Sequence, residues 1–249
     1  MSLATFYPKV LAVSIFTVML GCSQPSNSNQ PAEPKYEIIL PGDGRLNTAL
    51  LADHTIVYEK SGGKMTVAVS RETIGRRNFI TTKVWFNRDV SAPNPDTVRH
   101  TVDGMSFYSR RFGDPDVYLI DVKFDDNRFT GSLTPGPESD YSPVAYDKAY
   151  PHGGFEPAII FNAIRTLPLE EGFTASIPVF DLNDGSQMFW SNIEVVGAER
   201  IQFNGRAYNT LKVISDGIRR KTMWFAEGIP YPLQMATKGS PGLWKASAQ

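Results

Sequence analysis

The chain has 249 residues, of which 41% are hydrophobic and 20% are charged, and its formal net charge is -1. This composition is typical of a folded globular protein and excludes a disordered or collagen-like chain. The near-neutral charge argues against a nucleic-acid partner, because such proteins normally carry a basic excess. The single cysteine excludes an internal disulfide framework and a cysteine-based zinc site.

The N-terminal segment resembles a bacterial lipoprotein signal peptide. Lys9 precedes an apolar run at 10–20, which is too short for a membrane-spanning helix of about 20 residues. The run leads into the sequence MLGC at 19–22, which is similar to a lipobox and implies that Cys22 is acylated. Ser23 follows, and in Gram-negative lipoproteins a residue other than aspartate there implies export to the outer membrane. The alternative is an ordinary secretory signal peptide with a free cysteine.

These features predict three regions. Residues 1–21 form the signal peptide, 22–35 the lipidated N-terminus and a flexible tether, and 36–249 a single β-rich domain. The tether is rich in serine, asparagine, glutamine and proline and lacks large apolar side chains, as expected of a disordered linker. We therefore expect a periplasm-facing protein whose membrane attachment is its N-terminal lipid anchor.

After the tether, short alternating or apolar runs separated by turn residues indicate β-strands. A hairpin is expected at Ser61-Gly62-Gly63, and the Asp-Gly and Asn-Gly pairs favour tight turns between strands. These pairs begin at Asp103, Asp184, Asn204 and Asp216. The predicted strands cover residues 55–60, 64–70, 78–86, 105–111, 117–124, 174–180, 187–196, 208–215, 221–226 and 231–237.

One helix interrupts this pattern. Glu156-Pro157 opens it, because proline is favourable at a first helical position, and Leu167-Pro168 closes it. Helical spacing puts Ile160, Ala163, Ile164 and Leu167 on one face, and Asn162 and Arg165 on another. The sequence thus predicts a mainly β fold, with an antiparallel sheet and one amphipathic helix packed on it.

Two parts of the chain resemble an envelope protein family. Residues 155–169, followed by Gly172 and the strand 177–181, are similar to the middle of the DUF3108 family. Residues 221–225 and 231–235 resemble its closing hairpin and, more loosely, that of periplasmic lipoprotein carriers. The resemblance covers about Phe155 to Trp244 and implies a strongly curved sheet, half-barrel or barrel-like, around the helix. It implies no activity.

The sequence predicts no enzyme, no metal site and no cofactor. Ser61 and Lys64 have the spacing of a Ser-x-x-Lys nucleophile, but they lie in a predicted hairpin rather than on a helix. The acidic stretch 181–185 lacks the glycine and glutamate positions of a calcium loop. The histidines have no metal-type spacing, and His152 is the strongest candidate for chemistry because it lies in a long loop. Acid-base chemistry would require the fold to bring two carboxylates together. The candidates are Asp114, Asp116, Asp121, Asp125 and Asp126.

Adjacent aromatic residues in strands place one ring on each face of the sheet. We expect the concave face and the helix to enclose a hydrophobic ligand, contacted by Ile160, Ile164, Trp85, Trp190 and Trp224. The leading hypothesis is therefore a non-enzymatic envelope lipoprotein that binds a hydrophobic ligand or an envelope protein. The alternatives are a structural interaction module and, third, a carboxylate- or histidine-based envelope hydrolase. A cavity, an exposed interaction surface or a polar cleft would distinguish these three.

Overall fold

The computed structural model describes residues 33–112, 118–137, 139, 142–182, 187–217 and 220–247. The predicted signal peptide, Cys22 and most of the predicted tether lie outside these residues, and so does the predicted turn at Asp184-Gly185. Among the described helices, none has the length and apolar character needed to cross a membrane.

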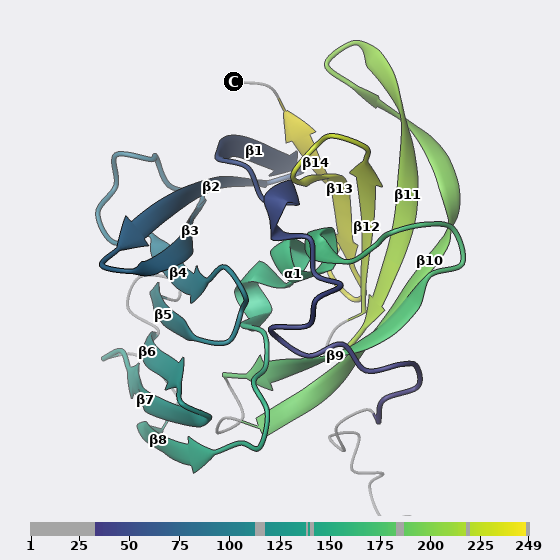
Figure 1. Cartoon of the computed structure of the whole chain (residues 1–249). Coiled ribbons are helices and arrows are strands. Elements are labelled where there is room, and N and C mark those ends of the chain that lie inside the picture. The colour runs from purple at the N-terminus through teal and green to yellow at the C-terminus, as the bar shows by residue number, and fades with distance from the viewer. Residues whose placement is uncertain are drawn as a thin grey trace, which may run out of the picture. The chain divides into compact units, whose positions relative to one another are not determined.

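The described chain folds into fourteen strands, one α-helix and two short 3₁₀ helices (Figure 1). The helices are η1 Thr48–Leu50, η2 Pro157–Ile159 and α1 Ile160–Thr166. The strands are β1 His54–Lys60, β2 Gly63–Ile74, β3 Arg77–Phe86, β4 Asp96–Thr101, β5 Phe107–Phe112, β6 Tyr118–Asp125, β7 Arg128–Pro135, β8 Val144–Ala149, β9 Thr174–Asp181, β10 Gln187–Phe203, β11 Arg206–Asp216, β12 Lys221–Ala226, β13 Pro232–Thr237 and β14 Trp244–Ser247.

All fourteen strands belong to one antiparallel sheet. Its order is β8-β7-β6-β5-β4-β3-β2-β1-β14-β13-β12-β11-β10-β9. The chain runs through β1 to β8 as consecutive neighbours, crosses to the other end of the sheet through α1, and returns from β9 to β14. Strand β14 pairs with β1, with Val57 opposite Ser247, so the two halves join there. Strands β8 and β9 are therefore the two ends of the sheet.

The sheet curves around α1, which lies inside the curve (Figure 1). This confirms the predicted mainly β fold with a strongly curved antiparallel sheet. The predicted helix is present and packs on the sheet, and every residue of α1 is buried, including the polar Asn162 and Arg165. The physical reason is that the sheet surrounds the helix, whereas a helix lying on one open face would keep a solvated side.

Several of the predicted turns connect consecutive strands in the structure. Asn204 and Gly205 have positive φ angles of 49° and 70° and connect β10 to β11. Four strands lie outside the predicted segments: β4, β7, β8 and β14. Strand β8 lies within residues 141–154, for which the sequence predicted no element.

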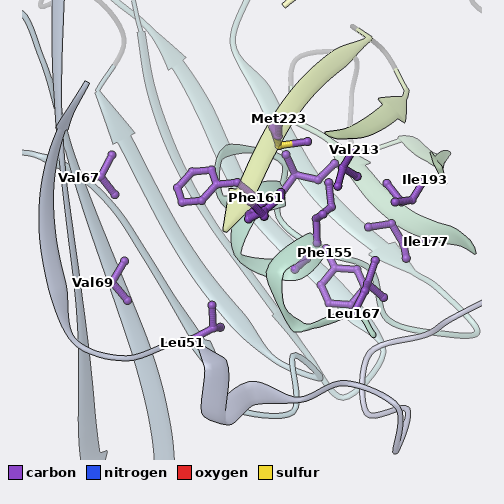
Figure 2. Packing of buried hydrophobic residues seen from close by; sticks show 14 of the residues in the cluster. Leu51, Val67, Val69, Phe155, Phe161, Leu167, Ile177, Ile193, Val213 and Met223 are labelled. Carbon is purple, nitrogen blue, oxygen red and sulfur yellow. The ribbon is translucent and has the colours of Figure 1, made fainter. Parts of the chain in front are cut away.

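Two hydrophobic clusters fill the inside of the curve. The larger one surrounds α1, and Figure 2 shows side chains of β2 and of β9 to β12 gathered around it. The smaller one is aromatic and draws mainly on β5 to β8. Phe180 of β9 also belongs to it, with its ring centroid 5.0 Å from that of Phe129 and 5.1 Å from that of Phe124. The end of β9 therefore packs against the β5 to β8 half through side chains.

Candidate functional site

The outer edge of β9 is covered by the chain itself. The N–H of Ser176 donates to the carbonyl of residue 37 at 2.9 Å, and its carbonyl accepts from the N–H of residue 39 at 3.0 Å. Phe155 donates to the carbonyl of Pro178 at 2.8 Å and accepts from the N–H of Phe180 at 3.0 Å. Pro178 itself has no N–H to satisfy. Alternate residues of this edge are thus paired, and it offers little to another strand.

The outer edge of β8 differs. In the described part of the chain, no strand other than β7 pairs with β8. Four of its six residues are exposed: Ala145, Asp147, Lys148 and Ala149. Tyr146 points inward, and its hydroxyl donates to the carbonyl of Leu182 at 2.8 Å. A side-chain hydrogen bond therefore connects β8 to the residue that follows β9, while no other described strand pairs with the backbone edge of β8.

Inside the sheet, the buried carboxylate of Glu156 holds the start of the helical segment. Its Oε2 accepts from the backbone N–H groups of Ala158 at 2.6 Å and Ile159 at 3.3 Å, as an N-cap side chain does. Its Oε1 accepts from the Ser109 hydroxyl at 3.0 Å and lies 3.9 Å from an Nη of Arg111. Burial raises the pKa of Glu156, although these four partners oppose that shift. The sequence pattern marked Glu156 only as a helix start.

A second carboxylate lies on the same inner face. Asp96 accepts from the backbone N–H of Phe112 at 2.7 Å, and burial raises the pKa of Asp96 while the charge of Arg111 opposes that rise. Asp96, Arg111, Ser109 and Glu156 thus form a polar track along β4 and β5. Two carboxylates with raised pKa values are a feature of some acid-base sites. Here both carboxylate oxygens of Glu156 already accept hydrogen bonds from the protein, which gives this residue a structural role.

The cavity beside this track is small. It lies next to the helical segment, is lined mainly by apolar side chains together with His100 and Glu156, and has a volume of about 30 Å³. That is room for about one water molecule, whereas ligand pockets measure about 300–1,000 Å³. A second hollow, lined by residues 62–64 and 87–89, is an open polar depression on the surface. Neither is shaped to enclose an acyl chain.

His100 lines the cavity and has one unpaired ring nitrogen in the described structure. Its Nδ1 lies 2.9 Å from the carbonyl of Thr101, and its buried Nε2 has no hydrogen-bond partner among the described residues. Burial lowers the pKa of His100, which favours the neutral ring. A neutral ring that donates from Nδ1 leaves Nε2 as an acceptor, and one water in the cavity would satisfy it.

The five residues predicted to contact a ligand do not share one space. Ile160 and Ile164 belong to the large core cluster, with exposures of 4% and 0%. Each of the three tryptophans follows a residue of the larger core cluster and therefore points to the opposite face of its strand, because strand side chains alternate. The core residues are Val84, Phe189 and Met223, and the residues that follow them are Trp85, Trp190 and Trp224.

Two of these tryptophans have local partners. The Nε1 of Trp224 donates to an Oε of Glu199 at 2.6 Å, and the other Oε accepts from Lys212, also at 2.6 Å. The ring of Trp190 lies 5.7 Å from that of His152. The strongest histidine candidate for chemistry therefore lies beside an aromatic ring.

The remaining sequence candidates are separated. Ser61 lies in the turn before β2, which contains Lys64, so no helix aligns them. Asp121 and Asp125 pair with Arg110 and Lys123 respectively, at 3.7 Å and 2.9 Å. Asp114 and Asp116 lie outside the described residues. Within the described residues, no three histidine, cysteine, aspartate or glutamate side chains are grouped to hold a metal.

Comparison with known proteins gives a family and one structural likeness. The model of the family DUF3108, described as a protein of unknown function, matches residues 61–240. A crystal structure of a β-barrel-like protein of the domain of unknown function DUF1849 from Brucella abortus is similar, with 11% sequence identity and a TM-score of 0.47. That likeness covers 81% of this chain and 96% of the other. No curated protein matches the sequence significantly.

Proposed function

Since this chain belongs to the DUF3108 family of proteins of unknown function, we propose its role from its own geometry: an envelope interaction module. The proposal rests on two observations: the helix α1 fills the interior of the sheet, and no described strand other than β7 pairs with β8. The chain's own helix α1 occupies the space where a barrel would hold its ligand. A partner protein would therefore bind outside the barrel-like interior, at the edge of β8 that pairs with no other described strand.

An extended segment of a partner protein would add to β8 as a further antiparallel or parallel strand. Alternate residues of β8 direct N–H and C=O groups away from β7, and such groups give strand addition its affinity. The small side chains of Ala145 and Ala149 do not block the approach. Lys148 lies at the rim and reaches to 5.5 Å from the ring of Tyr150. A lysine on an edge strand also discourages indiscriminate pairing.

The predicted lipid anchor would hold this module at the inner face of the outer membrane. Acylation at Cys22 supplies roughly 0.8 kcal/mol for each buried methylene, so more than one chain gives stable attachment. The predicted tether allows a reach on the order of 20 Å from the membrane surface. Anchor and location rest on the sequence of the first 35 residues alone.

The two alternatives have less support. A hydrophobic ligand between helix and sheet would have to displace packed side chains, because the cavity there has a volume of about 30 Å³. An acid-base hydrolase would need a cleft at its carboxylates, but Glu156 is fully buried and bonded to the backbone of the helical segment.

A photo-crosslinking experiment in the periplasm tests the proposal. Benzoylphenylalanine placed at Ala145 should form an adduct with a specific envelope protein. The same group at Lys83 is the matched control, because Lys83 is exposed on β3, a strand paired on both sides. Equal adducts at both positions, or none at Ala145, would reject β8 as the recognition edge.

Two proline variants sharpen this test. Asp147 and Lys148 are neighbours, so one N–H faces β7 and the other faces outward. We expect one of Asp147→Pro and Lys148→Pro to keep the melting temperature while abolishing the Ala145 adduct, and the other to lower the melting temperature. If the well-folded variant still forms the adduct, backbone pairing is not the mode of recognition.

A further inference from the structure

Arg165 is a buried cation without a partner in the described part of the chain. The residue lies in α1, inside the sheet, and is 8% exposed. Its buried Nε–H donates to no acceptor among the described residues, and no described carboxylate forms an ion pair with its guanidinium. Nothing in the described protein therefore neutralises this charge at close range.

The other ionised groups in the interior are compensated. Glu156 receives hydrogen bonds from Ser109 and two backbone N–H groups, and Arg111 lies 3.9 Å from it. Asp96 receives a backbone hydrogen bond and feels the charge of Arg111. Arg111 also has a buried Nε without a described partner, but Glu156 provides it with a counter-charge. What is particular to Arg165 is therefore the lack of a described counter-charge.

A second unpaired polar atom lies on the same side of the helix. Asn162 precedes Arg165 by three residues, a spacing that places side chains on adjacent positions of one helix face. Its Nδ2 donates to the Thr82 hydroxyl at 2.9 Å, while its Oδ1 is buried without a donor. Burial also lowers the pKa of Arg165, with no opposing charge to raise it. Buried unpaired polar groups are costly, and the two atoms need opposite partners. The Arg165 guanidinium needs an acceptor such as an oxyanion, whereas the Asn162 Oδ1 needs a donor.

We propose that Arg165 is the anion-binding group of a site for a phosphate or carboxylate group at α1. The planar guanidinium matches a pair of oxygens on such a group and donates to both. Nε is fully buried, whereas the residue as a whole keeps 8% exposure, so we expect the ligand to meet the Nη groups. The oxyanion supplies the negative charge that the described interior lacks there. It arrives either free in solution or as a lipid headgroup.

Thermal unfolding of the full-length protein in non-ionic detergent tests this site. At constant ionic strength, replacing chloride by inorganic phosphate should raise the melting temperature by about 3–6 °C at ten times the dissociation constant. Arg165→Met should abolish this response and melt higher than wild type in chloride, because it removes an uncompensated charge. The matched control is Arg128→Met, since Arg128 is exposed and paired with Asp147, and it should respond to phosphate as wild type does.

Soluble dihexanoyl phosphatidic acid forms the second arm. If both phosphate and the lipid raise the melting temperature, the ligand is a free oxyanion. If only the lipid raises it, the ligand is a lipid headgroup. If wild type responds to neither, or if Arg165→Met responds as strongly as wild type, the proposal is overturned. If Arg165→Met does not fold, NMR spectra of ¹⁵N-labelled protein provide the test. The Nε–H resonance that is missing from the spectrum of Arg165→Lys belongs to Arg165, and phosphate must shift this resonance in wild type.

Discussion

Replacing Glu156 with alanine tests how the helix is held inside the sheet. The carboxylate accepts from the N–H groups of Ala158 and Ile159, accepts from the Ser109 hydroxyl, and lies near Arg111. Alanine leaves these donors in a buried environment without an acceptor. The helix would then lose its N-cap, and Arg111 would lose its nearest carboxylate in this track.

The magnitude follows from these contacts. Loss of an N-cap side chain costs about 1 kcal/mol. Leaving a buried donor unsatisfied costs about 1–3 kcal/mol more. We therefore expect a loss of about 3 kcal/mol in the free energy of unfolding. At about 2–4 °C per kcal/mol for a domain of this size, the melting temperature should fall by about 6–12 °C.

Thermal and urea unfolding followed by circular dichroism at pH 7 measures this effect. The control is Glu72→Ala, because Glu72 is a surface carboxylate that pairs with Arg99 at 2.6 Å. Loss of that exposed pair should cost less than about 1 kcal/mol. If Glu156→Ala melts within about 2 °C of wild type, the capping role assigned to this carboxylate is wrong.

The pH dependence gives the same residue a second readout. Burial raises the pKa of Glu156 above the ordinary value of 4.5, so between these two values the folded state binds more protons than the unfolded state. The stability contributed by Glu156 is then complete below pH 4.5 and declines as pH rises through its raised pKa. Glu156→Gln cannot ionise, so wild type should lose stability relative to this variant as pH increases. A constant difference from pH 4 to 8 would contradict the raised pKa.

Three further changes test the core, the sheet and the anchor. Gly131→Ala should cost at least about 3 kcal/mol in urea unfolding, because a Cβ there would lie 2.2 Å from the carbonyl oxygen of Asp121 and the residue has φ of 136°. Ile160→Asp should lower the melting temperature by many degrees, since Ile160 is 4% exposed; melting unchanged from wild type would mean that its face is accessible. Cys22→Ser should abolish metabolic labelling with a fatty acid, and persistent labelling would exclude Cys22 as the attachment site.

Local chemistry made much of the sheet predictable. The Asn204-Gly205 turn was read correctly because positive φ angles suit these residue types, and the strands beside it alternate in polarity. Strands β4, β7, β8 and β14 were missed for physical reasons. Strand β7 contains Gly131 and ends at Pro135, residues that normally oppose strand structure, while β14 has four residues, too few for a periodic pattern.

The environment of the helix could not be predicted from its own residues. Periodicity puts the polar Asn162 and Arg165 on a different face from the apolar residues, but it does not say what that face meets, and in the structure both side chains are buried. Whether a sheet lies flat or curls around a helix depends on how its strands pair over long sequence distances. The same limit applies to the tryptophans: alternation puts Trp85 and Val84 on opposite faces of their strand, but it does not say which face meets the helix.

The short strand β14 has a consequence for how the molecule folds. Strands β1 to β8 and β9 to β13 are two runs of consecutive hairpins, whose local contacts form with little loss of chain entropy. Joining the runs requires Trp244–Ser247 to meet β1, across nearly the whole described chain. Closing so large a loop is slow, and until it closes the edges of β1 and β13 remain unpaired. The four residues of β14 thus cover two strand edges at once, and such edges are where strands of other chains can pair.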